Sequence, residues 1–266
     1  MKYVIDNDLH IHTRLSICSN DEEQTPENIL QIAKKRRLKR ICLTDHYWDE
    51  LVPCNTKVNW WYEAQNYKHI SQCLPLPKDE EVEILFGCEV DLDSSYRVGL
   101  PRERWDDFDF IIVSTTHFHH MCGEEWENCD EQALADLWVK RLDAVLRMDL
   151  PFQKVGLAHL ACGLIDINSR ERYLRVLDLI SAKEMQRLFT KAAMLGIGIE
   201  LNLGDVNCKQ EESEIVFRMF HIAKACGCKF YLGSDAHNLG AFKNVDVAFA
   251  RAIEILDLCE EDKFLL

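Results

Sequence analysis

Features typical of membrane and secreted proteins are missing from this sequence of 266 residues. No apolar run approaches the roughly 18 residues of a membrane-spanning helix, and residues 1–6 contain no signal-peptide hydrophobic region. The 12 cysteines form no repeated Cys-x-x-Cys pairs. Cys42, Cys88 and Cys226 lie inside apolar runs, where a free cysteine behaves as a small hydrophobic residue. We therefore expect a cytoplasmic protein with reduced cysteines and no membrane partner.

Positive charge is also scarce. The chain has 31 Lys and Arg against 45 Asp and Glu, which gives a formal net charge of −14. Non-specific binding of nucleic acid depends on a basic surface that neutralises phosphates. A basic cluster at residues 34–40 falls at the end of a predicted helix, where cations also suit the helix dipole. We therefore do not expect nucleic acid as a partner.

What the sequence does contain is a regular alternation of short apolar runs and helical stretches. The predicted strands cover residues 4–9, 40–44, 82–86, 108–114, 154–158, 197–201 and 229–232. Predicted helices include residues 26–37, with Thr25 as N-cap and Pro26 at the first helical position, and residues 131–148, 182–195 and 246–258. Strict alternation predicts a parallel α/β sheet. Without an internal repeat or a break in composition, a single domain over residues 1–266 is expected.

The residues Asp8-Leu9-His10-Ile11-His12 end the first apolar run. Side chains alternate along a strand, so His10 and His12 should point the same way. Two imidazoles on one face, where a strand runs out into a loop, form half of a metal site. A two-residue motif is a weak signal by itself, and an ordinary pair of polar residues at a strand end is the alternative.

Most of the later predicted strands also lead into a histidine or a carboxylate. These residues are His46, Glu89, His117, His159, Asp235 and His237. In a barrel of parallel strands the carboxyl ends lie together, so these side chains should converge. Imidazole with carboxylate suits Zn, Fe or Mn, and since one catalytic zinc takes about three protein ligands, the set predicts two or three divalent ions. Glu89, on a middle strand, is the predicted bridge between two ions.

Seven motifs in chain order carry a family resemblance. They are residues 8–13 (DLHIHT), 44–46 (TDH), 87–89 (GCE), 114–118 (STTHF), His159, residues 200–204 (ELNLG) and residues 234–237 (SDAH). With these motifs the chain resembles the PHP (polymerase and histidinol phosphatase) family, most of all its histidinol-phosphatase-type single-domain members. The resemblance implies a distorted (β/α)7 TIM-like barrel and a metal-dependent hydrolase.

The resemblance also implies how the ions are held. His10, His12, Glu89 and Asp235 would hold one ion, Glu89, His117 and His159 a second, and His46 with His237 a third. Phosphatases of the family usually carry a further histidine shortly after the first pair, and this chain has Cys18 there. A thiolate at this position would favour Zn or Fe. The alternative is an ordinary loop cysteine, with water completing the third site.

The expected reaction is the hydrolysis of a small phosphate monoester, histidinol phosphate or a related compound. Metal ions lower the pKa of a bridging water, so that a hydroxide can attack the phosphorus in line at neutral pH. Phosphoryl transfer of this kind needs no serine or cysteine nucleophile. Glu89, Asp235 and His237 are the residues that we assign to catalysis.

Substrate contacts are less well defined by the sequence. A cationic side chain should bind the phosphate bidentately. Arg14 is the candidate nearest to the histidine pair, and the alternatives on loops are Arg97, Arg102, Arg170 and Arg172. His120 is a further candidate contact, and Trp48, Phe118 and Trp126 are candidates for stacking on a ring. Asp8 and Asp45 are expected to orient imidazoles by accepting their second ring N–H.

Three other functions remain open at this point. A phosphodiesterase acting on nucleotides or oligonucleotides would use the same ligands, although the acidic composition counts against it. Amidohydrolases also begin with His-x-His on the first strand, but they end with a lone aspartate and not with an Asp-x-His pair. A non-catalytic metal-binding domain is the third alternative. The physiological substrate and the oligomeric state are not predicted.

Overall fold

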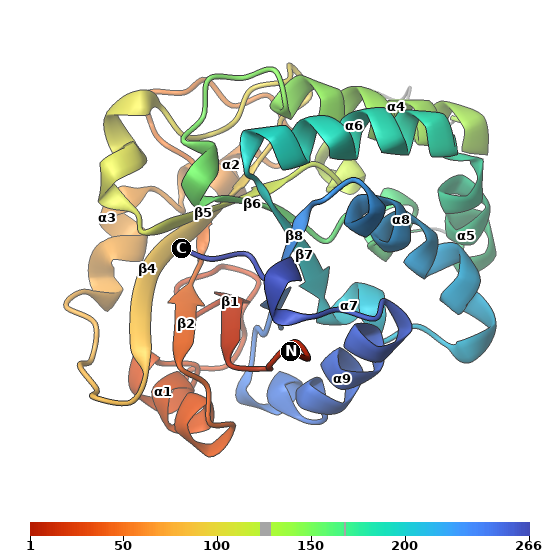
Figure 1. Ribbon diagram of the computed structural model, residues 1–266. Helices are drawn as coiled ribbons and strands as arrows, with labels where there is room; N and C mark the ends of the chain where they lie inside the picture. The colour runs from red at the N-terminus through yellow and green to blue at the C-terminus, as the bar shows by residue number, and fades with distance from the viewer. Residues whose placement is uncertain (123–128, 168) are drawn as a thin grey trace.

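A parallel β-sheet that follows the order of the chain lies at the centre of the computed structural model, which describes residues 1–122, 129–167 and 169–266 (Figure 1). All of the strand pairings among these residues are parallel. The spatial order is β1 (Asn7–Ile11), β2 (Arg40–Leu43), β4 (Glu83–Asp91), β5 (Phe110–Ser114), β6 (Val155–Ala158), β7 (Gly198–Asn202) and β8 (Lys229–Gly233), while the short β3 (His46–Tyr47) pairs with β4.

Helices surround this sheet on its outer side (Figure 1). They are α1 (Pro26–Lys35), α2 (Asn59–Glu63), α3 (Tyr67–Ile70), α4 (Glu131–Val145), α5 (Arg170–Leu179), α6 (Ala182–Leu195), α7 (Leu203–Val206), α8 (Ser213–Ala225) and α9 (Val245–Ile255). Short 3-10 helices are η1 (Ser71–Cys73), η2 (Arg102–Asp107), η3 (Phe118–His120), η4 (Phe152–Lys154), η5 (Gly163–Ile165), η6 (Gln210–Glu212), η7 (Leu239–Phe242) and η8 (Glu260–Asp262). None of the helices in the described ranges combines the length and apolar character that crossing a membrane requires.

Local signals explain where several helices begin and end. Thr25 caps α1 by accepting a hydrogen bond from the Asn28 N–H, and Pro26 occupies the first turn, where its missing N–H costs nothing. Gly196 ends α6 in the left-handed conformation, with φ of 75°. The stretch after residue 58 is divided into α2, α3 and η1, because Asn66 caps a new helix there.

The first and last strands meet along a seam that closes the barrel. At the carboxyl end of β1, the Asp235 N–H donates to the His10 carbonyl at 2.7 Å and the His12 N–H donates to the Ala236 carbonyl at 3.1 Å. At the amino end of β1, side chains replace backbone pairing, since Asn7 Oδ1 accepts from the Leu232 N–H and the Asp8 carboxylate accepts from the Ser234 N–H. This partly side-chain-mediated seam makes the barrel nearly closed and distorted. The predicted distorted (β/α)7 barrel in a single domain is confirmed.

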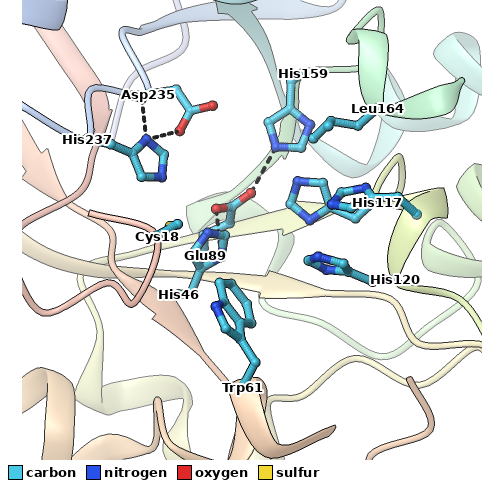
Figure 2. A pocket seen from close by; sticks show the side chains of 11 residues that line it. Cys18, His46, Trp61, Glu89, His117, His120, His159, Leu164, Asp235 and His237 are labelled. Carbon is cyan, nitrogen blue, oxygen red and sulfur yellow. Dashed lines mark hydrogen bonds and ion pairs between the residues drawn. The ribbon is translucent and has the colours of Figure 1, made fainter. Parts of the chain in front are cut away.

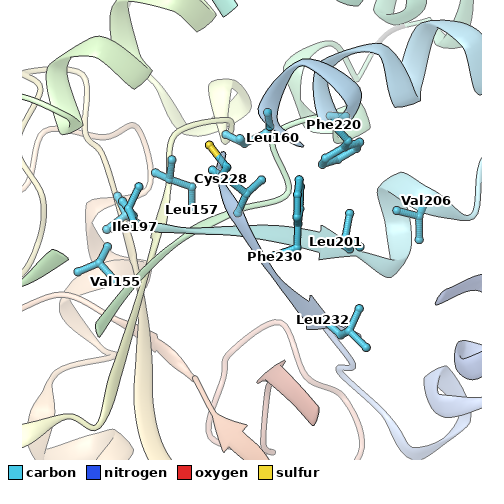
Figure 3. Close-up of a cluster of buried hydrophobic side chains, with 14 of the residues drawn as sticks. Val155, Leu157, Leu160, Ile197, Leu201, Val206, Phe220, Cys228, Phe230 and Leu232 are labelled. Atoms are coloured by element: carbon cyan, nitrogen blue, oxygen red, sulfur yellow. The ribbon is translucent and has the colours of Figure 1, made fainter. Parts of the chain in front are cut away.

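Apolar side chains fill both sides of the barrel wall. A small interior cluster contains Leu9, Cys42, Phe110, Ile112, Ala158, Tyr231 and Phe264. Phe264 reaches this cluster from the C-terminal segment, and the backbone N–H of Phe264 donates to the Phe230 carbonyl. The larger cluster lies between strands and helices, and Figure 3 shows the part in which β7 and β8 carry Leu201 and Phe230 toward Phe220 of α8. Burial on both faces is why the strands read as continuous apolar runs.

Two strands differ from their predicted limits in ways that affect the site. β4 continues to Asp91 and does not end at residue 86, so Glu89 lies inside a strand. β1 begins later and ends at Ile11, and its register against β2 shifts between Asp8 and Ile11. A β-bulge of this kind interrupts the alternation of side chains. It allows Leu9 to join the interior cluster while the next residue, His10, also points inward.

Candidate metal centre

Side chains from many strand ends converge at the carboxyl end of the barrel, around a cavity of about 260 Å³ (Figure 2). The described residues that line it are Cys18, His46, Trp61, Glu89, His117, His119, His120, His159, Leu164, Asp235 and His237. His10 and His12 lie alongside them and are completely buried. The polar residues predicted at the strand ends are therefore neighbours in space, as the barrel geometry requires.

Glu89 lies in the middle of this set (Figure 2). Its Oε1 is 2.9 Å from His159 Nε2, while its Oε2 is 3.4 Å from His10 Nε2 and 3.1 Å from His46 Nδ1. Potential ligand atoms form three groups, in each of which they lie within 4.8 Å of one another. These groups are His10, His12 and Glu89; Glu89, His117 and His159; and His12, His46 and His237. Glu89 is shared by two groups, and this is the position that a bridging ligand occupies.

Asp235 adds a second carboxylate beside the first group. Its Oδ1 is 3.1 Å from His12 Nε2 and 3.4 Å from His10 Nε2. Burial raises the pKa of Asp235, but the charge of His10 and the hydrogen bond with His12 lower it by a larger amount. The pKa of Asp235 therefore lies well below the usual value. Glu89 behaves alike, because His46 and His10 lower its pKa by more than burial raises it. Both carboxyl groups are therefore ionised, the form that ligates cations.

The outer nitrogens of five imidazoles are held by hydrogen bonds. The pairs are His10 Nδ1 with Glu200 at 2.7 Å, His12 Nδ1 with Ser16 Oγ at 2.8 Å, His117 Nδ1 with Asp91 at 2.6 Å, His159 Nδ1 with Thr116 Oγ1 at 2.9 Å, and His237 Nδ1 with the Asp235 carbonyl at 2.8 Å. In the neutral rings that ligate a metal ion, these oxygen acceptors hold the proton on Nδ1 and leave a lone pair on Nε2. Partners of this kind fix the tautomer and the ring orientation of metal-ligating histidines.

His46 provides a separate observation about the centre. Its Nδ1 is buried and has no hydrogen-bond partner among the described residues, although it faces Glu89. Burial holds the pKa of His46 well below its ordinary value. A buried, unpaired ring nitrogen aimed at a carboxylate is costly unless a cation occupies the space between them. The residues present thus fit divalent transition-metal ions, for which imidazole and carboxylate are the preferred ligands.

Arg141 of α4 connects the two segments that follow β4 and β5. This side chain is fully buried, and its guanidinium donates to the backbone carbonyls of Leu92, Asp93 and Thr115. These carbonyls follow β4 and β5, next to the segments that hold Asp91 and His117. Hydrogen bonds from a charged donor are stronger than neutral ones, so Arg141 fixes the backbone on which two of the site residues depend.

Several residues of the site were missed by the sequence analysis. Glu200 and Asp91 orient His10 and His117. Asp91 lies two residues after Glu89 on the same strand face, and this spacing could have identified it. Of the aspartates predicted to orient imidazoles, Asp45 acts only through Ser16, whose hydroxyl donates to it. Asp8 was assigned wrongly, because it accepts from Arg36 and from a backbone N–H at the barrel seam.

The arginines proposed as phosphate ligands do not line the cavity. Arg14 is half exposed and lies 3.6 Å from Glu22, Arg170 is paired with Glu212 at 2.5 Å, and Arg172 is paired with Asp166 at 2.8 Å. Arg97 and Arg102 pair with Asp93 and Asp149. None of the described lining residues is Arg or Lys. Among the predicted substrate contacts for which the structure describes a position, only His120 lines the cavity.

Cys18 and the predicted aromatic contacts are placed differently. Cys18 lines the cavity at an exposed position and is not part of the three ligand groups. Trp48 and Phe118 are buried and are not among the described lining residues, because the Trp48 ring packs edge-on against Tyr62 and the Phe118 ring lies under the Arg141 guanidinium. Trp126 lies outside the described residues. The aromatic side chain that does line the cavity is Trp61 of α2, whose ring contacts the edge of His46.

Comparison with known proteins identifies the family. A family model for the PHP domain matches residues 8–204 of the chain. The chain belongs to the PHP domain family. The match covers every proposed ligand except Asp235 and His237, which follow β8. This confirms the resemblance drawn from the strand-end motifs. Comparison with curated protein sequences gives no match.

Solved structures share the fold of this PHP domain. Histidinol phosphate phosphatase from Lactococcus lactis, crystallised with zinc, L-histidinol and phosphate, has a TM-score of 0.60 and 14% identity, with 98% of this chain and 99% of that chain covered. A putative histidinol phosphatase from Listeria monocytogenes has a TM-score of 0.62 and 13% identity, with 89% and 97% covered. At these identities the similarity establishes the barrel and not the activity.

Proposed function

We propose that this PHP domain is a metal-dependent phosphoesterase that hydrolyses a small-molecule phosphate monoester. The observation that supports this most directly is the position of Glu89, whose two carboxylate oxygens face different groups of imidazole nitrogens. A shared carboxylate can hold two cations at the separation of about 3.5–4 Å that two-metal phosphoesterases use. The family membership and the fold of the histidinol phosphatase structures are consistent with this role.

The ligands divide into two groups that share Glu89 and a third group that does not contain it. We assign His10, His12, Glu89 and Asp235 to one ion and Glu89, His117 and His159 to a second. His46 and His237 would hold a third ion, and Cys18 or water would complete its ligands. Zinc, iron and manganese all suit these donors.

Bound divalent ions would neutralise the phosphoryl oxygens and lower the pKa of a water molecule toward neutrality. The protein's part is to keep the ligands fixed and ionised. Glu200, Asp91, Ser16 and Thr116 hold the outer ring nitrogens, so the inner nitrogens need no rearrangement when substrate arrives. Glu89, Asp235 and His237 surround the reacting centre and are the residues that we assign to catalysis. Such preorganisation is a major source of rate enhancement.

The cavity supports a small substrate. About 260 Å³ is below the usual size of a site for a drug-sized ligand, and suits a phosphate with a short organic group. Because the described lining residues include no Arg or Lys, the phosphate would be held by the ions themselves. Histidinol phosphate is the first compound to test, since the Lactococcus lactis phosphatase binds L-histidinol and phosphate. The net charge of −14 disfavours oligonucleotide phosphodiesters.

The test combines metal analysis with hydrolysis assays on protein purified without chelator. We expect two or three Zn, Fe or Mn ions per chain and hydrolysis of p-nitrophenyl phosphate and of histidinol phosphate. Glu89→Gln keeps the shape of the side chain but removes its charge. It should lower the metal content per chain, and it should lower kcat by at least about 100-fold, the range for loss of a central electrostatic group.

Glu212→Gln is the matched control. Glu212 is also a buried carboxylate, but it pairs with Arg170 away from the cavity. The Glu212→Gln variant should retain the metal content and the activity of the wild type. Metal-free protein, or metal-loaded protein whose hydrolysis is indifferent to the Glu89 substitution, would exclude this mechanism and favour a binding role. Preference for bis-p-nitrophenyl phosphate over the monoester would instead indicate a phosphodiesterase.

A further inference from the structure

His120 lies on the cavity wall beside the proposed metal ligands (Figure 2). It ends η3, which directly follows His117, and its ring centroid is 5.6 Å from that of His117 and 5.5 Å from that of Trp61. The ring is thus one side chain away from the centre at which phosphate would be bound.

A chain of hydrogen bonds connects His120 to the metal ligand. Asp91 uses one carboxylate oxygen for His117 Nδ1, at 2.6 Å, and the other for the Tyr62 hydroxyl, at 2.7 Å. The Tyr62 oxygen is in turn 2.8 Å from His120 Nδ1. An ionised carboxylate only accepts hydrogen bonds, so the single hydroxyl proton of Tyr62 points to Asp91. The Tyr62 oxygen must then accept, and His120 must donate through Nδ1–H.

This direction fixes the tautomer of the neutral His120 ring. With its proton on Nδ1, Nε2 carries a free lone pair. Within the part of the chain that the structure describes, Nε2 has no hydrogen-bond partner, and it is not among the fully buried polar atoms. A neutral His120 therefore presents a hydrogen-bond acceptor to the cavity. It cannot hydrogen-bond a fully ionised phosphate, whose oxygens are themselves acceptors, and it has no proton to give to a leaving alkoxide.

We propose that His120 is a specificity-determining residue that accepts a hydrogen bond from an O–H or N–H group on the alcohol half of the substrate. Tyr62 and Asp91 act as positioning residues that keep its Nε2 available. This inference rests on the proposed phosphatase function and narrows its substrate class. Among esters that fit the cavity, those with a hydroxyl, ammonium or ring N–H a few bonds from the phosphate are preferred over purely alkyl esters.

The test compares isosteric substrates on the zinc-loaded protein at pH 8. 2-Hydroxyethyl phosphate and 2-aminoethyl phosphate carry the donor, and propyl phosphate lacks it. We expect kcat/KM to favour the donor esters by about three- to tenfold, the factor expected from one hydrogen bond to a neutral acceptor. In His120→Phe the ratio should fall to about one. Tyr62→Phe should also lower the ratio, although His120 is retained, because the tautomer is no longer fixed.

A spectroscopic measurement separates the tautomer from general effects on folding. ¹⁵N chemical shifts of the zinc-loaded protein should show His120 with protonated Nδ1 and unprotonated Nε2, and a mixture of tautomers in Tyr62→Phe. His221→Phe, at an exposed position of α8, is the control and should keep the substrate ratio. Equal kcat/KM for the esters in wild type, or a preference that survives in His120→Phe, would overturn the proposal. If the protein hydrolyses none of these esters and does not hydrolyse p-nitrophenyl phosphate either, the proposed function itself is overturned.

Discussion

Replacing Glu200 by glutamine changes one oxygen into an NH₂ group and leaves the shape of the side chain intact. Glu200 is completely buried at the inner face of β7, and both of its oxygens accept a hydrogen bond. Oε1 accepts from His10 Nδ1–H at 2.7 Å, and Oε2 accepts from the backbone N–H of His159 at 2.7 Å. Glutamine has one acceptor and one donor group, so either orientation of the amide breaks one of these two bonds.

The magnitude follows from what is lost at each end. A hydrogen bond to a charged group contributes about 1.5–3 kcal/mol, and the amide NH₂ would also face an N–H donor. We therefore expect Glu200→Gln to lower the free energy of unfolding of the metal-free protein by about 1.5–3 kcal/mol. Because Glu200 orients one metal ligand and the backbone of another, metal affinity should fall by about 10- to 100-fold, as for other partners of ligating histidines.

Two assays check these effects separately. Urea denaturation of chelator-treated protein measures stability, and competition with a chromogenic chelator measures the zinc dissociation constant. Glu212→Gln, which breaks the buried pair with Arg170, should lower stability but leave zinc affinity unchanged. An affinity of Glu200→Gln within twofold of wild type, at the expected loss of stability, would refute the view that Glu200 orients the ligands.

Three further changes test other parts of the structure. Gly233→Ala should weaken zinc binding at least as much, because an added Cβ would lie 1.8 Å from Glu200 Oε1, and an unchanged dissociation constant would contradict this packing. Arg141→Met should cost about 3 kcal/mol or more in urea denaturation, since it leaves buried carbonyls without a donor; a loss below about 1 kcal/mol would contradict that role. The hydrogen bond from Arg170 lowers the pKa of Glu212 to about 2, so the ionised form stabilises the fold. The deficit of Glu212→Gln should be full above pH 4.5 and vanish as the pH falls toward 2, and a pH-independent deficit would argue against the pair.

The ligand positions were predictable because they follow from local patterns. Apolar runs separated by helical stretches predict a parallel sheet, and in such a sheet a residue at a strand end lies at a known edge. His117, His159 and Asp235 were located by this rule without any knowledge of their contacts. Glu89 was also identified, although β4 extends to Asp91 and places it inside a strand. The error did not matter, because residues 89 and 91 both face the inside of the barrel.

Contacts that depend on loop paths were not predictable. The sequence singled out arginines near ligand-bearing strands, yet Arg170 and Arg172 turn away because buried acidic partners hold them. The sequence analysis did not single out Trp61, whose place at the cavity depends on the position of α2, where its ring centroid lies 4.7 Å from that of His46. The role of Tyr62 could not be inferred either, since its two partners are 29 and 58 residues away in the chain.

The sequence by itself determined the order of strands and helices and the set of imidazoles and carboxylates at one end of the barrel. These features depend on hydrophobic periodicity and on residue chemistry, which are written locally in the chain. Only the tertiary structure decided which nitrogen of most of the imidazoles faces the centre, because that choice depends on partners such as Glu200, Asp91 and Thr116, which come from distant segments. Long-range packing brings those partners to each ring, and no local pattern encodes it.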